Sequence, residues 1–133
     1  ARRFMRAFLP GPVTVVVARD PSLPDVLTAG RDRVGVRVPD NEVAASLFER
    51  AGVPVTATSA NRSGNPSVTR LDDLDPALRE VVAAVVDAGS TPGTESTVVD
   101  PDRNVVHRRG AMADAIVAWL ADEAGTAPVV EDG

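Results

Sequence analysis

Short valine-rich runs separated by glycine and proline dominate the hydrophobic pattern of this chain, and they predict β-strands that alternate with helices. Residues 13–18 form a near-continuous apolar run, which is typical of a strand covered on both faces. Residues 34–38 alternate strictly instead, so Gly35 and Arg37 share the face opposite the three valines. Both segments are predicted to be strands, and Pro39 ends the second one.

Three further segments are predicted to be helical. A short helix covers 3–9, where a Pro-Gly-Pro sequence stops it. A second helix follows a cap at Asp40 or Asn41 and ends at Gly52. A third covers 112–121. The side chains expected to face the interior are Val43, Ala44, Leu47, Phe48 and Ala51 in the second helix and Met112, Ile116, Trp119 and Leu120 in the third.

The remaining pattern completes one α/β domain. The further predicted strands are 53–58, 81–86, 96–99 and 104–108, the last two forming a hairpin. Two alanines within 81–86 are also compatible with a helix there, so that alternative remains. We therefore expect a twisted mixed β-sheet flanked by helices in one domain over 1–124, with a frayed C-terminal tail over 125–133.

Composition narrows the class of protein. The 133 residues suit one domain, and 44% hydrophobic with 25% charged residues is ordinary for a soluble globular protein. No run of about 18 apolar residues is present, which excludes a membrane span. No signal-peptide core opens the chain, so a cytoplasmic location is expected. The absence of cysteine excludes disulfides, and a single histidine excludes a multi-histidine metal site. The net charge of −5 argues against strong sequence-independent binding to nucleic acid.

The loop over 58–67 is the most informative candidate for chemistry. It leaves the carboxyl end of a predicted strand, where ligands bind in open α/β sheets, and it is dense in hydroxyl and amide side chains. Such a loop can surround a phosphate with N–H and O–H donors. An ordinary polar turn has the same composition, so the residue types alone leave both interpretations open.

Two arginine positions are the other candidates. Arg37 stands among valines in a predicted strand, where it needs a ligand, a carboxylate or solvent, and Gly35 would let a ligand approach the backbone. Arg108 closes the predicted hairpin, and a guanidinium can bind carboxylate or phosphate through two hydrogen bonds. An exposed sheet face and a solvated charge pair are the alternatives at these positions. No Gly-x-Ser-x-Gly elbow and no Walker-type loop occur, so no catalytic nucleophile is assigned.

Four regions of the chain, taken in order, resemble one family. They are 9–14 (Leu-Pro-Gly-Pro-Val-Thr), 34–39 (Val-Gly-Val-Arg-Val-Pro), 54–69 with Thr-Ser-Ala-Asn-Arg-Ser-Gly at its centre, and 95–100 (Glu-Ser-Thr-Val-Val-Asp) followed by 108–111 (Arg-Arg-Gly-Ala). The Ser-Ala-Asn-x-x-Gly and Glu-Ser-Thr-Val elements are fairly specific, and their order and spacing make coincidence improbable. Over about residues 4–112 the chain therefore resembles the YrdC/Sua5 family of threonylcarbamoyl-AMP synthases.

This resemblance implies a fold and an activity. The family fold is a twisted mixed sheet with helices around a concave groove lined by positive charge. The enzymes are nucleotidyltransferases that combine L-threonine, bicarbonate and ATP into threonylcarbamoyl-AMP and release pyrophosphate. Partner proteins then transfer the threonylcarbamoyl group to adenosine 37 of tRNAs that read ANN codons. Mg²⁺ would accompany ATP through its phosphates, and catalysis would depend on positioning and charge stabilisation.

The resemblance also implies site residues. Its motifs place ATP-binding positions at Thr14, Ser59, Asn61, Ser67 and Arg108, and threonine-binding positions at Arg37, Thr58 and Ser96. Arg37 would pair with the threonine carboxylate, while the hydroxyl groups would orient the carbamate and the phosphates. Neither a metal ligand nor a covalent catalyst is implied.

The chain departs from the family pattern in its first part. Family members carry a Pro-Thr-x-Thr-x-Tyr-Gly stretch and a Lys-x-Arg pair before the segment that opens this chain, which contains no tyrosine and no lysine. Arg109 stands where the family usually has proline. We therefore expect an N-terminally truncated member that lacks the N-terminal strands of the sheet and lacks full activity by itself. The alternatives are a YciO-like paralogue, an RNA-binding module that uses the basic groove, and a non-catalytic remnant.

Overall fold

The chain is divided into two compact units in a computed structural model that describes residues 1–131. Unit 1 joins the two ends of the chain, Ala1–Asp40 and Ser96–Gly133, whereas unit 2 is the intervening segment Asn41–Glu95. The domain predicted over 1–124 therefore contains a division that the sequence pattern did not indicate. Its outer boundary stays a prediction.

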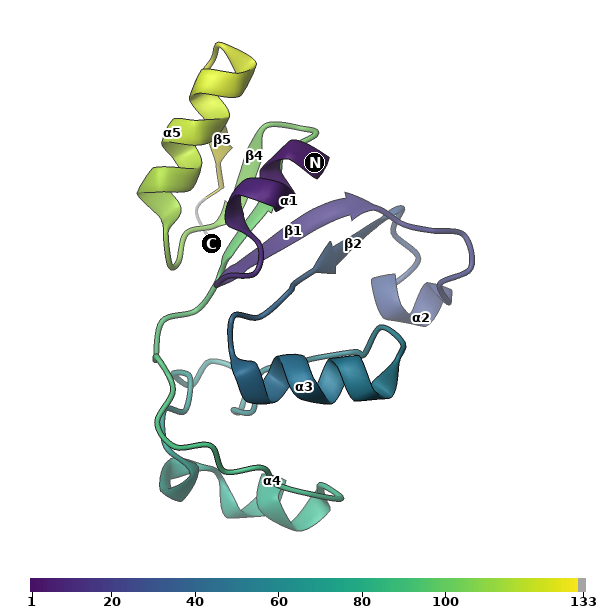
Figure 1. Cartoon of the computed structure of the whole chain (residues 1–133), viewed down its shortest axis with the longest axis vertical. Coiled ribbons are helices and arrows are strands. Elements are labelled where there is room, and N and C mark those ends of the chain that lie inside the picture. The colour runs from purple at the N-terminus through teal and green to yellow at the C-terminus, as the bar shows by residue number, and fades with distance from the viewer. Residues whose placement is uncertain (132–133) are drawn as a thin grey trace. The chain divides into compact units, whose positions relative to one another are not determined.

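Unit 1 contains a five-stranded mixed sheet in the order β2-β1-β3-β4-β5 (Figure 1). The strands are β1 (Val13–Ala18), β2 (Arg33–Val36), β3 (Thr97–Asp100), β4 (Val105–Arg108) and β5 (Val129–Val130). β1 pairs antiparallel with β2 and parallel with β3, while β3 and β4 form an antiparallel hairpin and β5 runs parallel to β4. The predicted mixed sheet and its hairpin are thus confirmed.

One face of this sheet carries the hydrophobic core. Two helices cover it, α1 (Arg2–Phe8) and α5 (Ala113–Ala124) (Figure 1). The fully buried core side chains are Phe4, Val13, Val15, Val99, Val106 and Ile116, with Leu120 nearly so. Alternate residues of β1, Thr14 and Val16, are only half-buried. The prediction that this strand is covered on both faces is therefore wrong, and its second face is where polar side chains gather.

The two ends of α5 differ from the prediction. Met112 caps the helix in a left-handed conformation with φ 62° and is 47% exposed, so the expectation that it faces the interior is wrong. Ile116 and Leu120 do lie in the core. Beyond the helix, the segment expected to be frayed contains β5, whose Val129 and Val130 pair with β4. Strand pairing thus orders this segment, and residues 132–133 of the predicted tail lie outside the described residues.

Unit 1 also contains the short helix α2 (Asp25–Thr28), in a region without a clear sequence pattern. In unit 2, α3 (Glu42–Ala51) begins at the Asn41 cap and ends at Gly52, as predicted. The Asn41 side chain accepts a hydrogen bond from the Ala44 backbone N–H at 3.0 Å. A 3₁₀ turn, η1 (Leu71–Asp73), and α4 (Pro76–Val81) follow.

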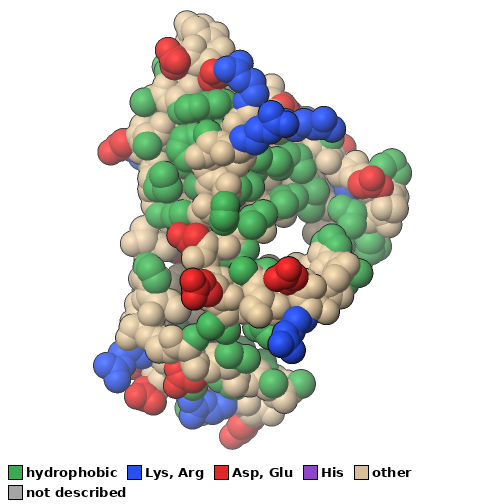
Figure 2. Space-filling model, viewed as in Figure 1, with side chains coloured by type: hydrophobic (Ala, Val, Ile, Leu, Met, Phe, Trp, Pro, Cys, Tyr) green, Lys and Arg blue, Asp and Glu red, His purple; other side chains and the backbone are tan. Residues whose placement is uncertain are grey.

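The strands predicted over 53–58 and 81–86 are wrong, because the described residues of unit 2 contain no strand. β-branched residues stabilise a strand only where a neighbouring strand and a packed face are present. The apolar side of α3 is likewise not an interior face: Val43 is 40%, Leu47 50% and Phe48 37% exposed. Figure 2 shows hydrophobic side chains reaching the surface in this unit as well as in unit 1. Among residues 1–131, no helix combines the length and apolarity needed to cross a membrane.

Candidate functional site

Three of the predicted site residues meet on the half-buried face of the unit 1 sheet. The hydroxyl oxygens of Thr14 and Ser96 are 3.1 Å apart, within hydrogen-bond distance. The Arg108 guanidinium donates to the Ser96 carbonyl oxygen from Nη2 at 2.9 Å and from Nε at 3.3 Å. Ser96 is buried, whereas Thr14 and Arg108 are half-exposed. Segments more than 80 residues apart in sequence are thus joined into one polar cluster.

Strand register explains why these side chains meet. Thr14 of β1 lies opposite Val98 of β3, and Val98 lies opposite Arg108 of β4. Directly opposed residues project to the same face of a sheet, so Thr14 and Arg108 share a face with Val98 between them. Ser96 precedes β3 and projects beside them by the same alternation. The core residues Val13, Val15 and Val99 occupy the opposite face.

Arg37 stands just beyond β2, at the edge of this face. Val36 of β2 pairs with Val15, and one further step of this ladder would bring Arg37 opposite Thr14. The Arg37 side chain is exposed and makes no hydrogen bond or ion pair with any residue in the described range 1–131. Its charge is therefore open to a ligand.

Gly35 keeps the space beside Thr14 open. A Cβ atom at Gly35 would lie 3.0 Å from the Thr14 methyl carbon, closer than side chains normally pack. The absence of a side chain at this position leaves room for the Thr14 methyl group. The approach of a ligand to the backbone at Gly35 stays a prediction.

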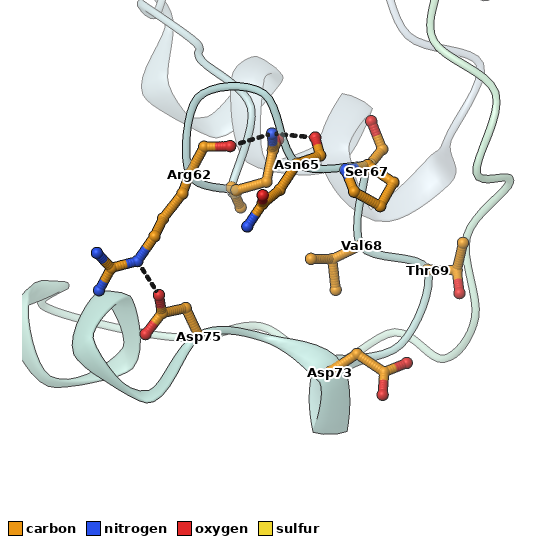
Figure 3. A pocket seen from close by; sticks show the side chains of 10 residues that line it. Arg62, Asn65, Ser67, Val68, Thr69, Asp73 and Asp75 are labelled. Carbon is orange, nitrogen blue, oxygen red and sulfur yellow. Dashed lines mark hydrogen bonds and ion pairs between the residues drawn. The ribbon is translucent and has the colours of Figure 1, made fainter.

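The second group of predicted residues lies in unit 2, around a hollow with a volume of about 460 Å³ (Figure 3). Asn61 and Ser67 line this hollow. Asn61 organises its rim, because its side-chain Nδ2 donates to the backbone oxygens of Arg62 at 3.1 Å and Asn65 at 3.0 Å. Two carbonyl partners fix the orientation of the Asn61 amide, which leaves its Oδ1 as an acceptor for other groups.

An ion pair that sequence reasoning missed crosses one side of this hollow. The Arg62 Nε donates to Asp75, and Figure 3 shows the two side chains reaching toward each other. This hydrogen bond lowers the pKa of Asp75 and raises the pKa of Arg62. Asp75 also accepts from the Ala77 backbone N–H at 2.9 Å, which caps α4. The Asp-Pro sequence at 75–76 was the available signal, since aspartate followed by proline commonly starts a helix.

Two predicted residues are not drawn into either group. Thr58 and Ser59 are exposed, and neither lines the hollow around Asn61 and Ser67. They lie on extended chain without strand pairing. The structure thus brings together Thr14, Ser96 and Arg108 in unit 1, and Asn61 and Ser67 in unit 2.

The chemistry available at these positions is recognition of anions and hydroxyl groups. The unit 1 face offers two guanidinium groups and two hydroxyls, and the unit 2 hollow offers amide and hydroxyl groups. Over residues 1–131, no three histidine, cysteine, aspartate or glutamate side chains gather as a metal site. The donor set suits carboxylate and phosphate better than a directly bound cation.

Comparison with known proteins places these motifs in a family. The model of the Sua5/YciO/YrdC family, described as "Telomere recombination", matches residues 1–110. A threonylcarbamoyl-AMP synthase of Pyrococcus abyssi is 39% identical over 101 residues, which are 75% of this chain and 30% of that protein. A putative threonylcarbamoyl-AMP synthase of Mycobacterium leprae is 35% identical over 131 residues, which are 96% of this chain and 58% of that protein.

A solved structure has the same fold. The crystal structure of P. abyssi Sua5 complexed with L-threonine matches with a TM-score of 0.81 at 31% identity, over 98% of this chain and 38% of that one. The mixed five-stranded sheet with its helices is therefore a fold that this relative shares. The chain spans between 30% and 58% of the length of the two curated relatives.

Proposed function

The chain belongs to the Sua5/YciO/YrdC family, and from this premise we propose that it serves the synthesis of threonylcarbamoyl-AMP from L-threonine, bicarbonate and ATP. The observation that carries the proposal is the cluster of Thr14, Ser96 and Arg108 on the open sheet face, with Arg37 at its edge. These residues come from three of the motifs that carry the family resemblance. Because the chain spans only part of the length of its relatives, the role that we propose for the chain itself is the binding of threonine and nucleotide.

We place L-threonine beside Arg37 and Ser96. The free guanidinium of Arg37 can hold a carboxylate through two parallel hydrogen bonds. The Ser96 hydroxyl, 3.1 Å from that of Thr14, can rotate to donate to one partner and accept from another. A relative has been crystallised with L-threonine, which supports this substrate. Thr58 is proposed as a further threonine contact from its motif alone.

We propose ATP contacts in each unit separately, at Thr14 and Arg108 in unit 1 and on the loop over 58–67 in unit 2, the latter from its motif. Arg108 supplies positive charge at the carboxyl-terminal end of β4, where a phosphate chain would be stabilised. Asn61 donates both of its amide hydrogens to its own turn, so its Oδ1 would accept from a ribose hydroxyl or the adenine amino group. Ser59 and Ser67 are proposed as hydroxyl contacts to the nucleotide.

The proposed chemistry requires no covalent intermediate with the protein. The threonine amine and bicarbonate would form a carbamate with loss of water, and a carbamate oxygen would attack the α-phosphorus of ATP and displace pyrophosphate. The side chains would position the reactants and stabilise negative charge. Since no carboxylate cluster is present in the described part of the chain, Mg²⁺ would be held chiefly by the phosphates of ATP. The product would pass to the tRNA threonylcarbamoyl-transfer proteins, which fits a cytoplasmic location.

Binding measurements on single variants test this proposal. Calorimetry should show L-threonine and ATP binding to the chain, with Arg37→Ala weakening threonine and Arg108→Ala weakening ATP by about tenfold or more. Arg31→Ala, which removes an exposed arginine of the same unit, is the matched control and should change neither affinity. Threonine-dependent and bicarbonate-dependent pyrophosphate release, measured with the full-length product of the gene, then tests the reaction. Binding that is unchanged in both variants would contradict the site.

A further inference from the structure

Thr97 is a buried polar residue that the proposed chemistry does not use. It is the first residue of β3 and is fully buried, on the core face with Val13 and Val99. Its hydroxyl donates to the Ala111 carbonyl oxygen at 2.7 Å and accepts from the Gly110 backbone N–H at 2.9 Å. A hydroxyl has one hydrogen to donate and lone pairs to accept, so Thr97 is bound on both sides to one turn.

That turn follows directly on Arg108, the last residue of β4. It connects β4 to α5 over residues 109–112. Ser96, next to Thr97 in sequence, forms an isolated parallel bridge with Ala111 and receives the Arg108 guanidinium on its carbonyl oxygen. Two consecutive residues of one segment therefore hold both the side chain of Arg108 and the backbone that follows it.

A bulge in β4 determines on which face of the sheet Arg108 lies. Val99 pairs with Val106, but Val98 pairs with Arg108, so β4 contains one extra residue, His107. Without the extra residue, Val98 would oppose His107, and Arg108 would fall on the core face opposite Thr97. The bulge turns Arg108 to the face that carries Thr14, as bulges beside functional sites commonly do.

The bulge also leaves the chain after Arg108 without the regular hairpin ladder. The Gly110 N–H and Ala111 C=O would otherwise need partners in a partly buried environment, because unpaired backbone groups are costly away from water. The Thr97 hydroxyl supplies both partners at once. A valine of the same shape could fill the space but could make neither bond.

We propose that Thr97 is the positioning residue for Arg108: its hydroxyl fixes the Gly110–Ala111 turn and so holds the guanidinium across Ser96 on the open sheet face. The consequence for ligand binding rests on the proposed function, in which Arg108 contacts ATP. The consequence for the Arg108 side chain does not depend on that function. The two consequences can therefore be measured separately.

The experiment compares Thr97→Val, which keeps the shape and removes the hydroxyl, with Thr97→Ser, which keeps the hydroxyl. The first readout is the Arg108 Nε–Hε resonance in ¹H–¹⁵N spectra, assigned by its disappearance in Arg108→Lys. We expect T97V to shift or broaden this resonance and to weaken ATP binding by roughly three- to tenfold, the loss expected when a hydrogen-bonded anchor is removed. T97S should retain the wild-type resonance and bind ATP within about twofold of wild type.

Ile116→Val is the control for a general loss of stability, because it trims the same buried core without removing a hydrogen bond. It should leave the Arg108 resonance and the ATP affinity unchanged. An unchanged Arg108 resonance in T97V, or equal effects of T97V and I116V, would overturn the proposal. If the wild-type chain does not bind ATP, the proposed function fails, while the Arg108 resonance still decides the role of Thr97.

Hydrogen exchange keeps the proposal testable even if T97V does not fold. In the wild-type chain and in T97S, the Gly110 amide should exchange at least about a hundredfold more slowly than an exposed amide, because it donates to a buried hydroxyl. Exchange of the wild-type Gly110 amide at the rate of an exposed amide would overturn the proposal without any variant.

Discussion

The two units hold their candidate site residues by different means. In unit 1, Thr14 and Arg108 project from strands whose opposite face packs against α1 and α5. In unit 2, Asn61 and Ser67 lie on a loop. Hydrogen bonds from the Asn61 side chain to the loop backbone and the Arg62–Asp75 ion pair hold this loop. All residues of the hydrophobic core cluster belong to unit 1, and no described residue of unit 2 is buried.

This difference assigns different roles to the two groups. A side chain on a packed sheet keeps its position without a ligand, which reduces the entropy lost on binding. A loop held by exposed hydrogen bonds opens at a lower free energy and gains order when a ligand bridges it. Under the proposed function, we therefore expect the unit 1 face to be positioned for threonine before binding, and the unit 2 loop to become ordered mainly when nucleotide binds.

Deleting the same side chain in each unit should give the largest contrast. Phe4 of unit 1 is 1% exposed and stacks on Phe8 with ring centroids 4.6 Å apart, whereas Phe48 of unit 2 is 37% exposed. Phe4→Ala should lower the free energy of unfolding by about 3–5 kcal/mol, because it leaves a cavity in the core. Phe48→Ala should cost about 1 kcal/mol or less. Urea unfolding followed by far-ultraviolet circular dichroism, to which the helices of both units contribute, measures both, and equal losses would refute the contrast.

The second-largest contrast should be in the stability lost when one ion pair is broken in each unit. Asp100 of unit 1 has no exposed surface and accepts from Arg33 Nη2 at 2.7 Å, with a second contact between Arg33 Nε and Asp100 Oδ2 at 2.6 Å that lacks hydrogen-bond geometry. Asp100→Ala should cost about 3 kcal/mol, since it removes the buried partner of Arg33 and leaves that charge with the longer contact to Asp102 at 3.6 Å. Asp75→Asn in unit 2 keeps the cap on α4 and removes only an exposed pair, so the urea midpoint should hardly move. A larger loss for Asp75→Asn than for Asp100→Ala would contradict this ranking.

Local sequence patterns predicted most of unit 1, because its strands contain clear apolar runs and its hairpin is closed by a short turn. The apolar run at 13–18 and the hairpin around 100–102 contain their own strand and turn signals. The sequence could not predict that β1 is covered on one face only, because coverage depends on what packs against the sheet. It also did not indicate the bulge at His107, since a bulge is defined by the partner strand.

The same patterns failed in unit 2. Valine-rich segments at 53–58 and 81–86 have strand composition, yet no strand pairs with them among the described residues. For the candidate site, the motifs named Thr14, Ser96 and Arg108, which the structure joins. They did not name Thr97, because a buried threonine in a strand is ordinary in sequence and gains meaning only from its partners at Gly110 and Ala111. The ligand assignments of all the predicted site residues, including Thr58 and Ser59, stay predictions.

The smallest expected contrast lies between two aspartates whose pKa values are lowered, one in each unit. In unit 2, the hydrogen bond from Arg62 is the largest cause of the lowered pKa of Asp75. In unit 1, hydrogen bonds from the Ser22 hydroxyl and backbone N–H lower the pKa of Asp20, without a cation. Both carboxylates thus stabilise the folded chain at pH values above the ordinary aspartate pKa of about 4, and that contribution is lost as the pH falls through the folded-state value.

Salt should distinguish the two carboxylates, because mobile ions screen a charge pair more than they affect hydrogen bonds between neutral donors and a carboxylate. An increase from low salt to about 1 M salt should therefore raise the pKa of Asp75 more than that of Asp20. Titration of the side-chain carboxyl ¹³C resonances at the two salt concentrations measures both pKa values. Arg62→Gln should raise the pKa of Asp75 and remove most of its salt dependence. Ser22→Ala should raise the pKa of Asp20 without making that pKa depend on salt. If salt moved both values equally, the loop of unit 2 would not depend on the Arg62 charge, and neutral turn hydrogen bonds such as those of Asn61 would be what holds the hollow open.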